Sequence, residues 1–208
     1  MTERPKEKIP NARFTRLELL HALREKLFGC NLHAVEPERV YRLARGRVRD
    51  EDFLPLLKRL GIRTAVDLRR AGTAGQDPLP PGAFQQEGIR HENVHLRSSA
   101  LPFPSHLQRF VDILDGADYP LLFFCKRGTD KTGFASMLYL LLIRNESIET
   151  ARRHLAFLPF GHKKRRHEGP WDFMRLLREN GHPQNLRDWI RDDYPDLFRR
   201  ERPDEEGA

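Results

Sequence analysis

LLFFCKRGTDKTG, which spans Leu121 to Gly133, is the stretch that decides the fold of this chain. Four apolar residues lead to Cys125, and a second apolar run follows from Phe134 to Ile143. This order predicts a buried strand, a tight loop and the start of a core helix. Backbone N–H groups and the positive end of a helix converge at such a loop, where they favour a cysteine thiolate and a bound phosphate.

Strands and helices alternate on both sides of this stretch. Apolar patterns predict strands over 62–68, 89–96 and 119–125, extended structure over 35–43 and a long loop over 71–88. Helices are expected over 50–60, 105–115, 148–157, 170–180 and 184–193, with Asp50 and Ser147 as N-caps. A capping-box pattern at 15–18 adds a helix before the first strand. The alternation indicates an α/β fold whose central, mostly parallel sheet is flanked by helices, with extra helices at both ends.

Length and composition indicate one soluble domain. The chain has 208 residues, of which 32% are charged. We expect a flexible arm over 1–14, a single domain over 15–198 and a disordered tail over 199–208. No apolar segment approaches the roughly 20 residues of a membrane span, and the charged N-terminus lacks a signal-peptide pattern. A cytoplasmic protein is therefore expected, and Cys30 and Cys125 make no disulfide framework.

The formal net charge of +7 favours anionic ligands. The basic segment His162–His167 could contact such a ligand or be a solvated loop. Nucleic-acid binding rests only on the net charge and this segment, so it is the weakest of the functions considered. His91 and His95 are four residues apart without a third ligand, so no metal site is expected.

The cysteine loop resembles the signature loop of the cysteine-dependent protein tyrosine and dual-specificity phosphatases: Cys, five residues, Arg, then Ser or Thr. Val40-Tyr41-Arg42 and the segment 57–69, which ends in Asp67-Leu68-Arg69, resemble the opening of the atypical dual-specificity branch of bacteria and fungi. The resemblance covers about residues 39–160, the core of the expected domain. It implies a protein tyrosine phosphatase-like fold. Asp67 and Arg69 lie at the end of a predicted strand, where we expect a structural ion pair and not a catalytic one.

The resemblance also implies a chemistry that needs neither a metal nor a cofactor. Cys125 would attack phosphorus and form a phosphocysteine, and Thr132 would hydrogen-bond the sulfur to ease its departure. Gly128 would let the backbone curl around the phosphate. The phosphate would be held by the loop amides and by Lys126, Arg127, Gly128, Thr129, Asp130 and Lys131. The implied partner is a phosphorylated protein or a small anionic phosphate ester.

Two residues, one in the loop and one just before the cysteine, depart from this pattern. Lys131 stands where the pattern has Arg, which keeps the charge but loses the planar fork that grips two phosphate oxygens. Arg127 could substitute in part, or could be a surface or substrate-recognition residue. Phe124 stands where the family has His, and it is expected to pack in the core.

The proton donor is the third departure. The family carries an Asp on a mobile loop well before the cysteine, where it protonates the leaving oxygen. In the corresponding segment, between Glu92 and Asp112, this chain has no Asp or Glu. Asp130, inside the loop, is either the acid or a structural carboxylate that pairs with a nearby cation. His95 and His106 are weaker candidates. These departures leave two functions open: a phosphatase, or a pseudophosphatase that binds phosphorylated ligands without turnover.

Overall fold

The computed structural model describes residues 29–71, 79–80, 82–163, 168–181, 183 and 185–205. Its centre is a five-stranded sheet in the order β1-β2-β5-β3-β4. The strands are β1 (His33–Glu36), β2 (Val40–Ala44), β3 (Thr64–Asp67), β4 (Arg90–Asn93) and β5 (Leu121–Cys125). β1 is antiparallel to β2, and the other neighbours are parallel. The predicted α/β fold with a mostly parallel sheet is therefore confirmed.

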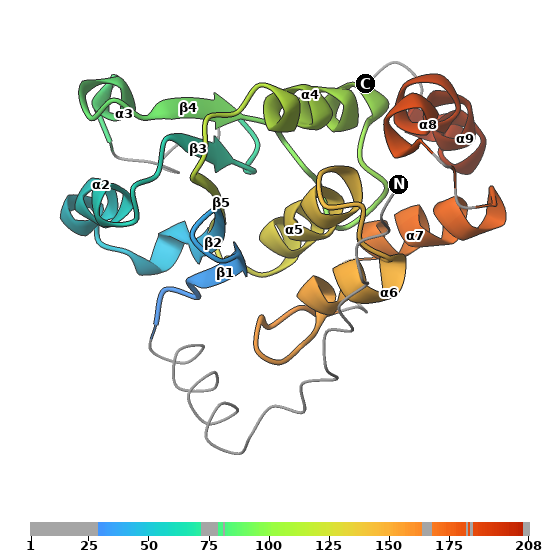
Figure 1. Cartoon of the computed structure of the whole chain (residues 1–208). Coiled ribbons are helices and arrows are strands. Elements are labelled where there is room, and N and C mark those ends of the chain that lie inside the picture. The colour runs from blue at the N-terminus through green and yellow to red at the C-terminus, as the bar shows by residue number, and fades with distance from the viewer. Residues whose placement is uncertain are drawn as a thin grey trace, which may run out of the picture.

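Helices cover both faces of the sheet (Figure 1). They are α2 (Asp50–Arg59), α3 (Ala83–Gln86), α4 (Pro104–Asp115), α5 (Asp130–Leu142), α6 (Ile148–Ala151), α7 (Gly169–Glu179), α8 (Leu186–Asp192) and α9 (Tyr194–Glu201). Short 3₁₀ helices are η1 (Arg45–Arg47), η2 (Arg152–Leu155) and η4 (Pro203–Glu205). Each predicted helix of the described chain is present. α3 was not predicted, because it lies within the Gly- and Pro-rich segment expected to be a loop.

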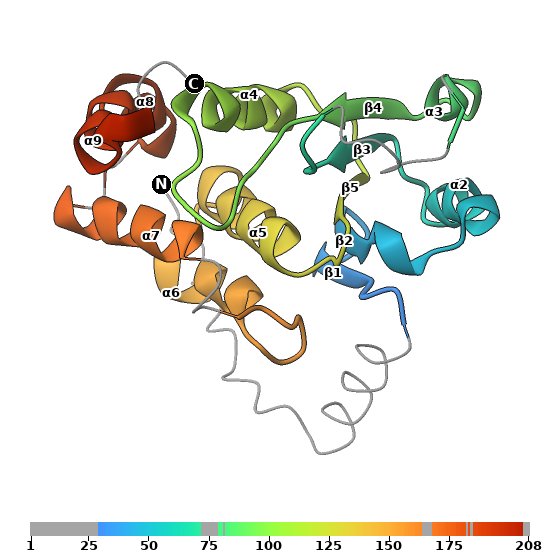
Figure 2. The same cartoon turned by 180° about the vertical axis from the view of Figure 1, so that it is seen from behind.

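Side-chain alternation along β5 divides the core in two. Phe123 and Cys125 belong to a large apolar cluster with α4, α5 and the C-terminal helices. Leu122 and Phe124 belong to a smaller cluster with α2. The two views agree that α2 lies on one side of the sheet and α5 on the other (Figure 2). β5 is buried along its whole length, which explains why its sequence is continuously apolar.

The parallel strands end at a common edge of the sheet. In register, Ala44 of β2 pairs with Cys125 of β5, and Asp67 of β3 pairs with Asn93 of β4. Because β3 and β5 are also parallel neighbours, the cysteine loop, the end of β3 and the segment after β4 meet there. Open α/β sheets bind ligands at this carboxyl edge.

Two predictions about helix starts had different outcomes. Ser147 caps α6, since its Oγ accepts a hydrogen bond from the backbone N–H of Thr150 at 3.2 Å. Asp50 does not cap α2: it is the first residue of that helix, and its carboxylate pairs with the buried Arg45 at 2.6 Å. The ion pair with the preceding 3₁₀ turn draws the side chain away from the helix amides.

The prediction of a disordered tail over 199–208 is corrected for residues 199–205. α9 continues to Glu201 and η4 follows it, while Glu205 pairs with Arg97. Residues 199–205 are ordered through contacts that their polar composition does not reveal. Residues 206–208, the arm 1–14 and the predicted helix after Thr15 lie outside the described residues.

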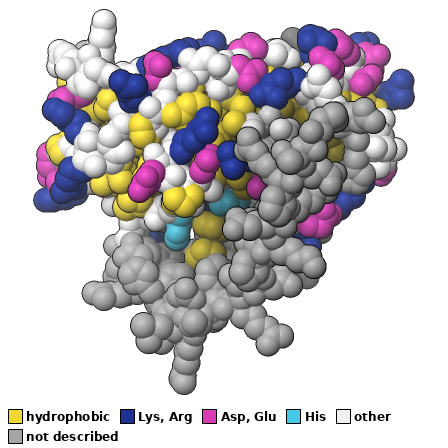
Figure 3. All heavy atoms as spheres, in the orientation of Figure 1, with side chains coloured by type: hydrophobic (Ala, Val, Ile, Leu, Met, Phe, Trp, Pro, Cys, Tyr) yellow, Lys and Arg dark blue, Asp and Glu magenta, His cyan; other side chains and the backbone are white. Residues whose placement is uncertain are grey.

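The described surface carries mixed charge. On the face shown in Figure 3, basic and acidic side chains are interspersed along the described part, with no large area of one sign. Within the described ranges, no helix is both long enough and apolar enough to cross a membrane.

Candidate active site

The cysteine loop has the predicted strand–loop–helix form. Cys125 is the last residue of β5, four residues form the loop, and α5 begins at Asp130. Cys125 is only 5% exposed, which places its thiol at the base of the loop. The first amides of a helix have no partners within the helix, so those of α5 are available to an anion.

Gly128 is required by the backbone of the loop. Its φ of +62° lies in the left-handed region, and a Cβ on it would come within 2.5 Å of the Ala44 backbone nitrogen. The loop therefore lies directly against the end of β2. The buried Asn31 fixes this position further, because its side-chain amide donates to the Gly128 carbonyl at 2.7 Å.

Arg42 braces the loop from behind. It lies on β2 and is fully buried. Its Nη2 donates to the carbonyls of Gly128 at 3.1 Å and Thr129 at 2.7 Å, and Nη1 donates to the His154 carbonyl at 2.9 Å. Because the N–H and C=O of a peptide unit point in opposite directions, binding the carbonyls from behind leaves the loop amides for an anion in front. In the sequence, Arg42 stood out only as part of a family pattern, and nothing suggested this role.

Burial lowers the pKa of Arg42 to about 9, against the opposing influence of Cys125 and Asp130. At neutral pH the guanidinium is therefore charged. A positive charge behind the loop favours both a thiolate and a bound dianion.

Replacing Arg42 with methionine is expected to lower the free energy of unfolding by about 3 kcal/mol, because buried carbonyls lose their donor. Binding of inorganic phosphate should weaken as the loop loosens. Chemical denaturation and calorimetry measure the two effects. The partly exposed Arg39, which directly precedes the same strand, supplies the control, and Arg39→Met should cost less than about 1 kcal/mol. Undiminished phosphate affinity in folded Arg42→Met would contradict the bracing role.

Thr132 lies in the first turn of α5 and is fully buried. Its Oγ1 accepts a hydrogen bond from Arg42 Nη2 at 3.1 Å and lies 3.4 Å from the Thr129 carbonyl, to which it donates. Its hydroxyl thus links the brace to the loop. The hydrogen bond to the Cys125 sulfur stays a prediction.

Lys131 is half-buried beside the cysteine. Burial lowers its pKa, and the negative charges of Cys125 and Asp67 act in the opposite direction. Its ammonium thus lies near both the nucleophile candidate and the end of β3. Asp67 itself is taken up by a buried ion pair with Arg69 at 2.7 Å, so the predicted structural pair is confirmed.

Asp130 is the one carboxylate among residues 125–133, and it is buried. One of its oxygens, Oδ2, accepts a hydrogen bond from Thr129 Oγ1 at 2.8 Å and lies 3.3 Å from Arg127 Nη2. The other oxygen, Oδ1, lies 3.1 Å from Nδ1 of His162. His162 was placed by the sequence in a basic loop, but its side chain is only 1% exposed and belongs to this site. No local pattern signals a contact between residues 32 positions apart.

The remaining loop residues face outward or into the core. Lys126 and Arg127 are exposed at the rim, where a phosphate ester could reach them. Phe124 is fully buried and stacks on Phe84 and His91, with ring centroids 6.5 and 6.2 Å away. The prediction that Phe124 packs in the core is confirmed.

The histidine candidates for the proton donor are poorly suited to it. Burial, together with the nearby positive charge of Lys131, lowers the pKa of His95 to about 4, so this ring is neutral at pH 7. Burial also lowers the pKa of His106, whose ring centroid lies 5.9 Å from that of His95. Neither imidazole is held in the charged form.

The segment between β4 and α4, where the resemblance places the acid, is held by the C-terminal helices. Tyr194 donates its hydroxyl hydrogen to the Pro102 carbonyl at 2.7 Å, and the Gly169 N–H donates to the Ser98 carbonyl at 3.1 Å. Arg97 pairs with Glu205. Figure 2 shows this segment descending beside α5 and reaching α7. This segment, residues 94–103, is therefore held in place beside α5 and contains no carboxylate; we refer to it as the wall.

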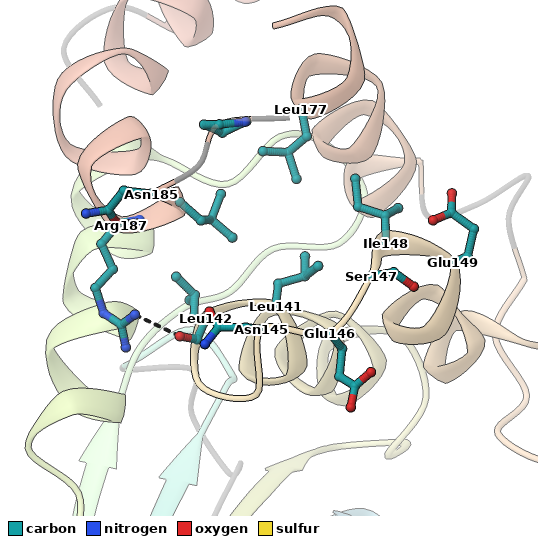
Figure 4. Close-up of a pocket in the computed structure, with 12 residues that line it drawn as sticks. Leu141, Leu142, Asn145, Glu146, Ser147, Ile148, Glu149, Leu177, Asn185 and Arg187 are labelled. Carbon is teal, nitrogen blue, oxygen red and sulfur yellow. Dashed lines mark hydrogen bonds between the residues drawn. The ribbon is translucent and has the colours of Figure 1, made fainter. Parts of the chain in front are cut away.

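A cavity of about 330 Å³ lies at the opposite end of α5 (Figure 4). Leu141 and Leu142, at the C-terminal end of α5, line it together with Leu177 and Arg187 from α7 and α8. Arg187 is taken up by hydrogen bonds to the Leu142 carbonyl and to Asp115. α5 separates this cavity from the cysteine loop by its length of 13 residues, about 20 Å. Within the described ranges no group of three or more potential metal ligands comes together.

Similar folds occur among solved structures. TpbA from P. aeruginosa, in a complex with pTyr, aligns with a TM-score of 0.56 at 17% identity, over 78% of this chain and 88% of that chain. Human DUSP28 aligns with a TM-score of 0.53 at 18% identity, over 72% and 94%. The core catalytic domain of the PP-IP phosphatase SIW14 from S. cerevisiae aligns with a TM-score of 0.50 at 21% identity, over 74% and 94%. No protein-family model and no curated protein sequence matches the chain.

Proposed function

Because the chain has the fold of the protein tyrosine and dual-specificity phosphatases, we propose that it hydrolyses a phosphate monoester through Cys125 without a metal. One observation carries this proposal. The thiol lies at the start of a left-handed glycine loop whose carbonyls are bound from behind by Arg42 and Asn31, at the N-terminus of α5. This arrangement suits a thiolate and a bound phosphate together.

The proposed reaction has two steps. The Cys125 thiolate attacks phosphorus, so an S–P bond forms while the bond to the leaving oxygen breaks, and that oxygen takes up a proton. Water then attacks phosphorus, the S–P bond breaks, and phosphate and the thiolate are released. Lys131 and the loop amides hold the phosphoryl oxygens, and Thr132 assists departure of the sulfur. Asp130 and solvent water are the two candidate proton donors.

The substrate class follows from the charges at the rim. Lys126 and Arg127 are exposed, and Lys131 lies beside the thiol, so the mouth of the site favours an anion. A phosphorylated protein or a small anionic phosphate ester meets this requirement. The TpbA structure contains pTyr, which is consistent with an aryl phosphate.

Hydrolysis of 4-nitrophenyl phosphate by the purified chain tests the proposal. We expect turnover that persists with a chelator, and a rapid acid quench that traps phosphate on Cys125. If the chain binds phosphate but neither turns over nor forms the covalent adduct, the pseudophosphatase alternative holds. Two observations favour that alternative: Lys131 stands where the family pattern has Arg, and the segment between β4 and α4 contains no carboxylate.

Lys131→Arg should raise kcat/KM at neutral pH by on the order of 100-fold, since the fork restores a two-oxygen contact in a preorganised anion site. The pH dependence should also change. Burial lowers the pKa of Lys131, so the wild type loses this cation, and with it activity, at a lower pH than an ordinary lysine would. Arginine stays protonated, so the fall in rate at alkaline pH should occur at a higher pH than in the wild type. Identical pH–rate profiles would show that residue 131 does not hold the phosphate.

A further inference from the structure

Polar groups that carry hydrogens lie close to both carboxylate oxygens of Asp130. Thr129 Oγ1 at 2.8 Å and Arg127 Nη2 at 3.3 Å approach Oδ2, and His162 Nδ1 at 3.1 Å approaches Oδ1. The side chain is only 8% exposed. Two hydrogen bonds to one oxygen and a close N–H beside the other favour the ionised form of a carboxyl group, whereas a proton donor must begin each cycle protonated.

Trp171 determines which ring nitrogen of His162 carries the hydrogen. The indole Nε1–H can only donate, and it points at His162 Nε2 at 3.2 Å. Nε2 must therefore accept, which leaves the proton on Nδ1, 3.1 Å from the carboxylate. This contact is close, although it is not a linear hydrogen bond. A residue at the start of α7 thus sets the tautomer of a histidine that holds the phosphate loop.

We infer that Asp130 is a positioning carboxylate, not the proton donor, and that His162 and Trp171 are its supports. This inference rests on the proposed function. Asp130 fixes the hydroxyl of Thr129 and directs the Arg127 guanidinium at the rim, where the Arg127 side chain is 64% exposed and can reach an anion. Arg127 then adds a second positive charge for the bound anion, beside that of Lys131.

This role has a consequence for the substrate. Without an internal acid, the leaving oxygen takes its proton from water, so the rate depends steeply on the basicity of the leaving group. Phenolic oxygens, with a pKa of about 10, leave more readily than the far more basic alkoxides. The site therefore favours aryl phosphates over alkyl phosphates.

The test compares the full-length wild type with Asp130→Asn, His162→Phe and His162→Asn. Each is assayed on 4-nitrophenyl phosphate, whose leaving group is weakly basic, and on phenyl phosphate, whose leaving group is more basic. Binding of inorganic phosphate is measured by calorimetry, and melting temperatures identify variants that fail to fold. The amide nitrogen of asparagine can take the place of Nδ1–H, so His162→Asn is the conservative control.

Asp130→Asn and His162→Phe are expected to lose about tenfold in kcat/KM, by the same factor on both substrates, and to bind phosphate more weakly. His162→Asn should recover most of the loss. A loss of about 100- to 10,000-fold on phenyl phosphate, with 4-nitrophenyl phosphate nearly unaffected, would identify Asp130 as the acid and overturn the inference. Unchanged kinetics and binding in folded Asp130→Asn and His162→Phe would overturn it as well.

The two proposals fail in distinguishable ways. If the wild type neither hydrolyses either substrate nor binds phosphate, the proposed function is wrong. If the wild type binds phosphate without turnover, the calorimetric comparison alone still decides whether Asp130 and His162 position the loop.

Discussion

Cys125→Ser is expected to abolish turnover of 4-nitrophenyl phosphate, with a loss of at least about 10,000-fold in kcat. A serine hydroxyl at this position would have to attack as an alkoxide. The loop amides and the N-terminus of α5 stabilise a thiolate, whereas a serine hydroxyl stays protonated at neutral pH even beside them. Steady-state kinetics measures the loss, and the acid-quenched variant should carry no phosphate.

The second cysteine provides the matched control. Cys30 is only partly buried and packs beside the smaller core cluster, so Cys30→Ser should retain most of the activity. Phosphate binding by Cys125→Ser should also survive, because the loop amides remain. Residual turnover in Cys125→Ser close to that of the wild type would remove Cys125 as the nucleophile.

Gly128→Ala is expected to have the largest effect on stability, on the order of 4 kcal/mol in the free energy of unfolding. A left-handed φ costs an alanine about 1–2 kcal/mol, and the Cβ would lie 2.5 Å from the Ala44 nitrogen and 2.7 Å from the Leu43 carbonyl carbon. These are backbone atoms of a central strand, so they cannot rotate away. Denaturant unfolding measures the cost, and phosphate binding should be lost in whatever fraction folds.

Gly61→Ala separates the two causes. Gly61 has nearly the same φ, +64°, but a Cβ on it would meet nothing within 4 Å. It should therefore show the conformational cost alone, about 1 kcal/mol, with phosphate binding intact. Equal losses in the two variants would mean that Gly128 is not pressed against β2.

The sequence predicted those features that depend on neighbouring residues. The strand–loop–helix unit at Cys125 follows from one continuous stretch, and the parallel sheet follows from the alternation of strands and helices around it. Burial of Phe124 and the Asp67–Arg69 pair also followed from local pattern. Helix starts were less certain, since Asp50 pairs with Arg45 instead of capping α2.

Contacts between distant residues could not be predicted in this way. Arg42 meets the loop carbonyls across 86 and 87 positions, and His162 reaches Asp130 from a segment that looked merely basic. The order of the C-terminal tail depends likewise on Glu205 meeting Arg97. Such contacts follow from how the strands and helices pack, which composition and periodicity do not specify.

The wall formed by the segment after β4 has a bearing on how the protein matures. Its anchors, Tyr194 and Glu205, follow Pro102 and Arg97 by 92 and 108 positions. A ribosome synthesises the sheet and the cysteine loop well before it reaches these anchors. The nascent chain thus acquires its thiol while the segment after β4 still lacks these anchors, and translation of α9 and η4 supplies them.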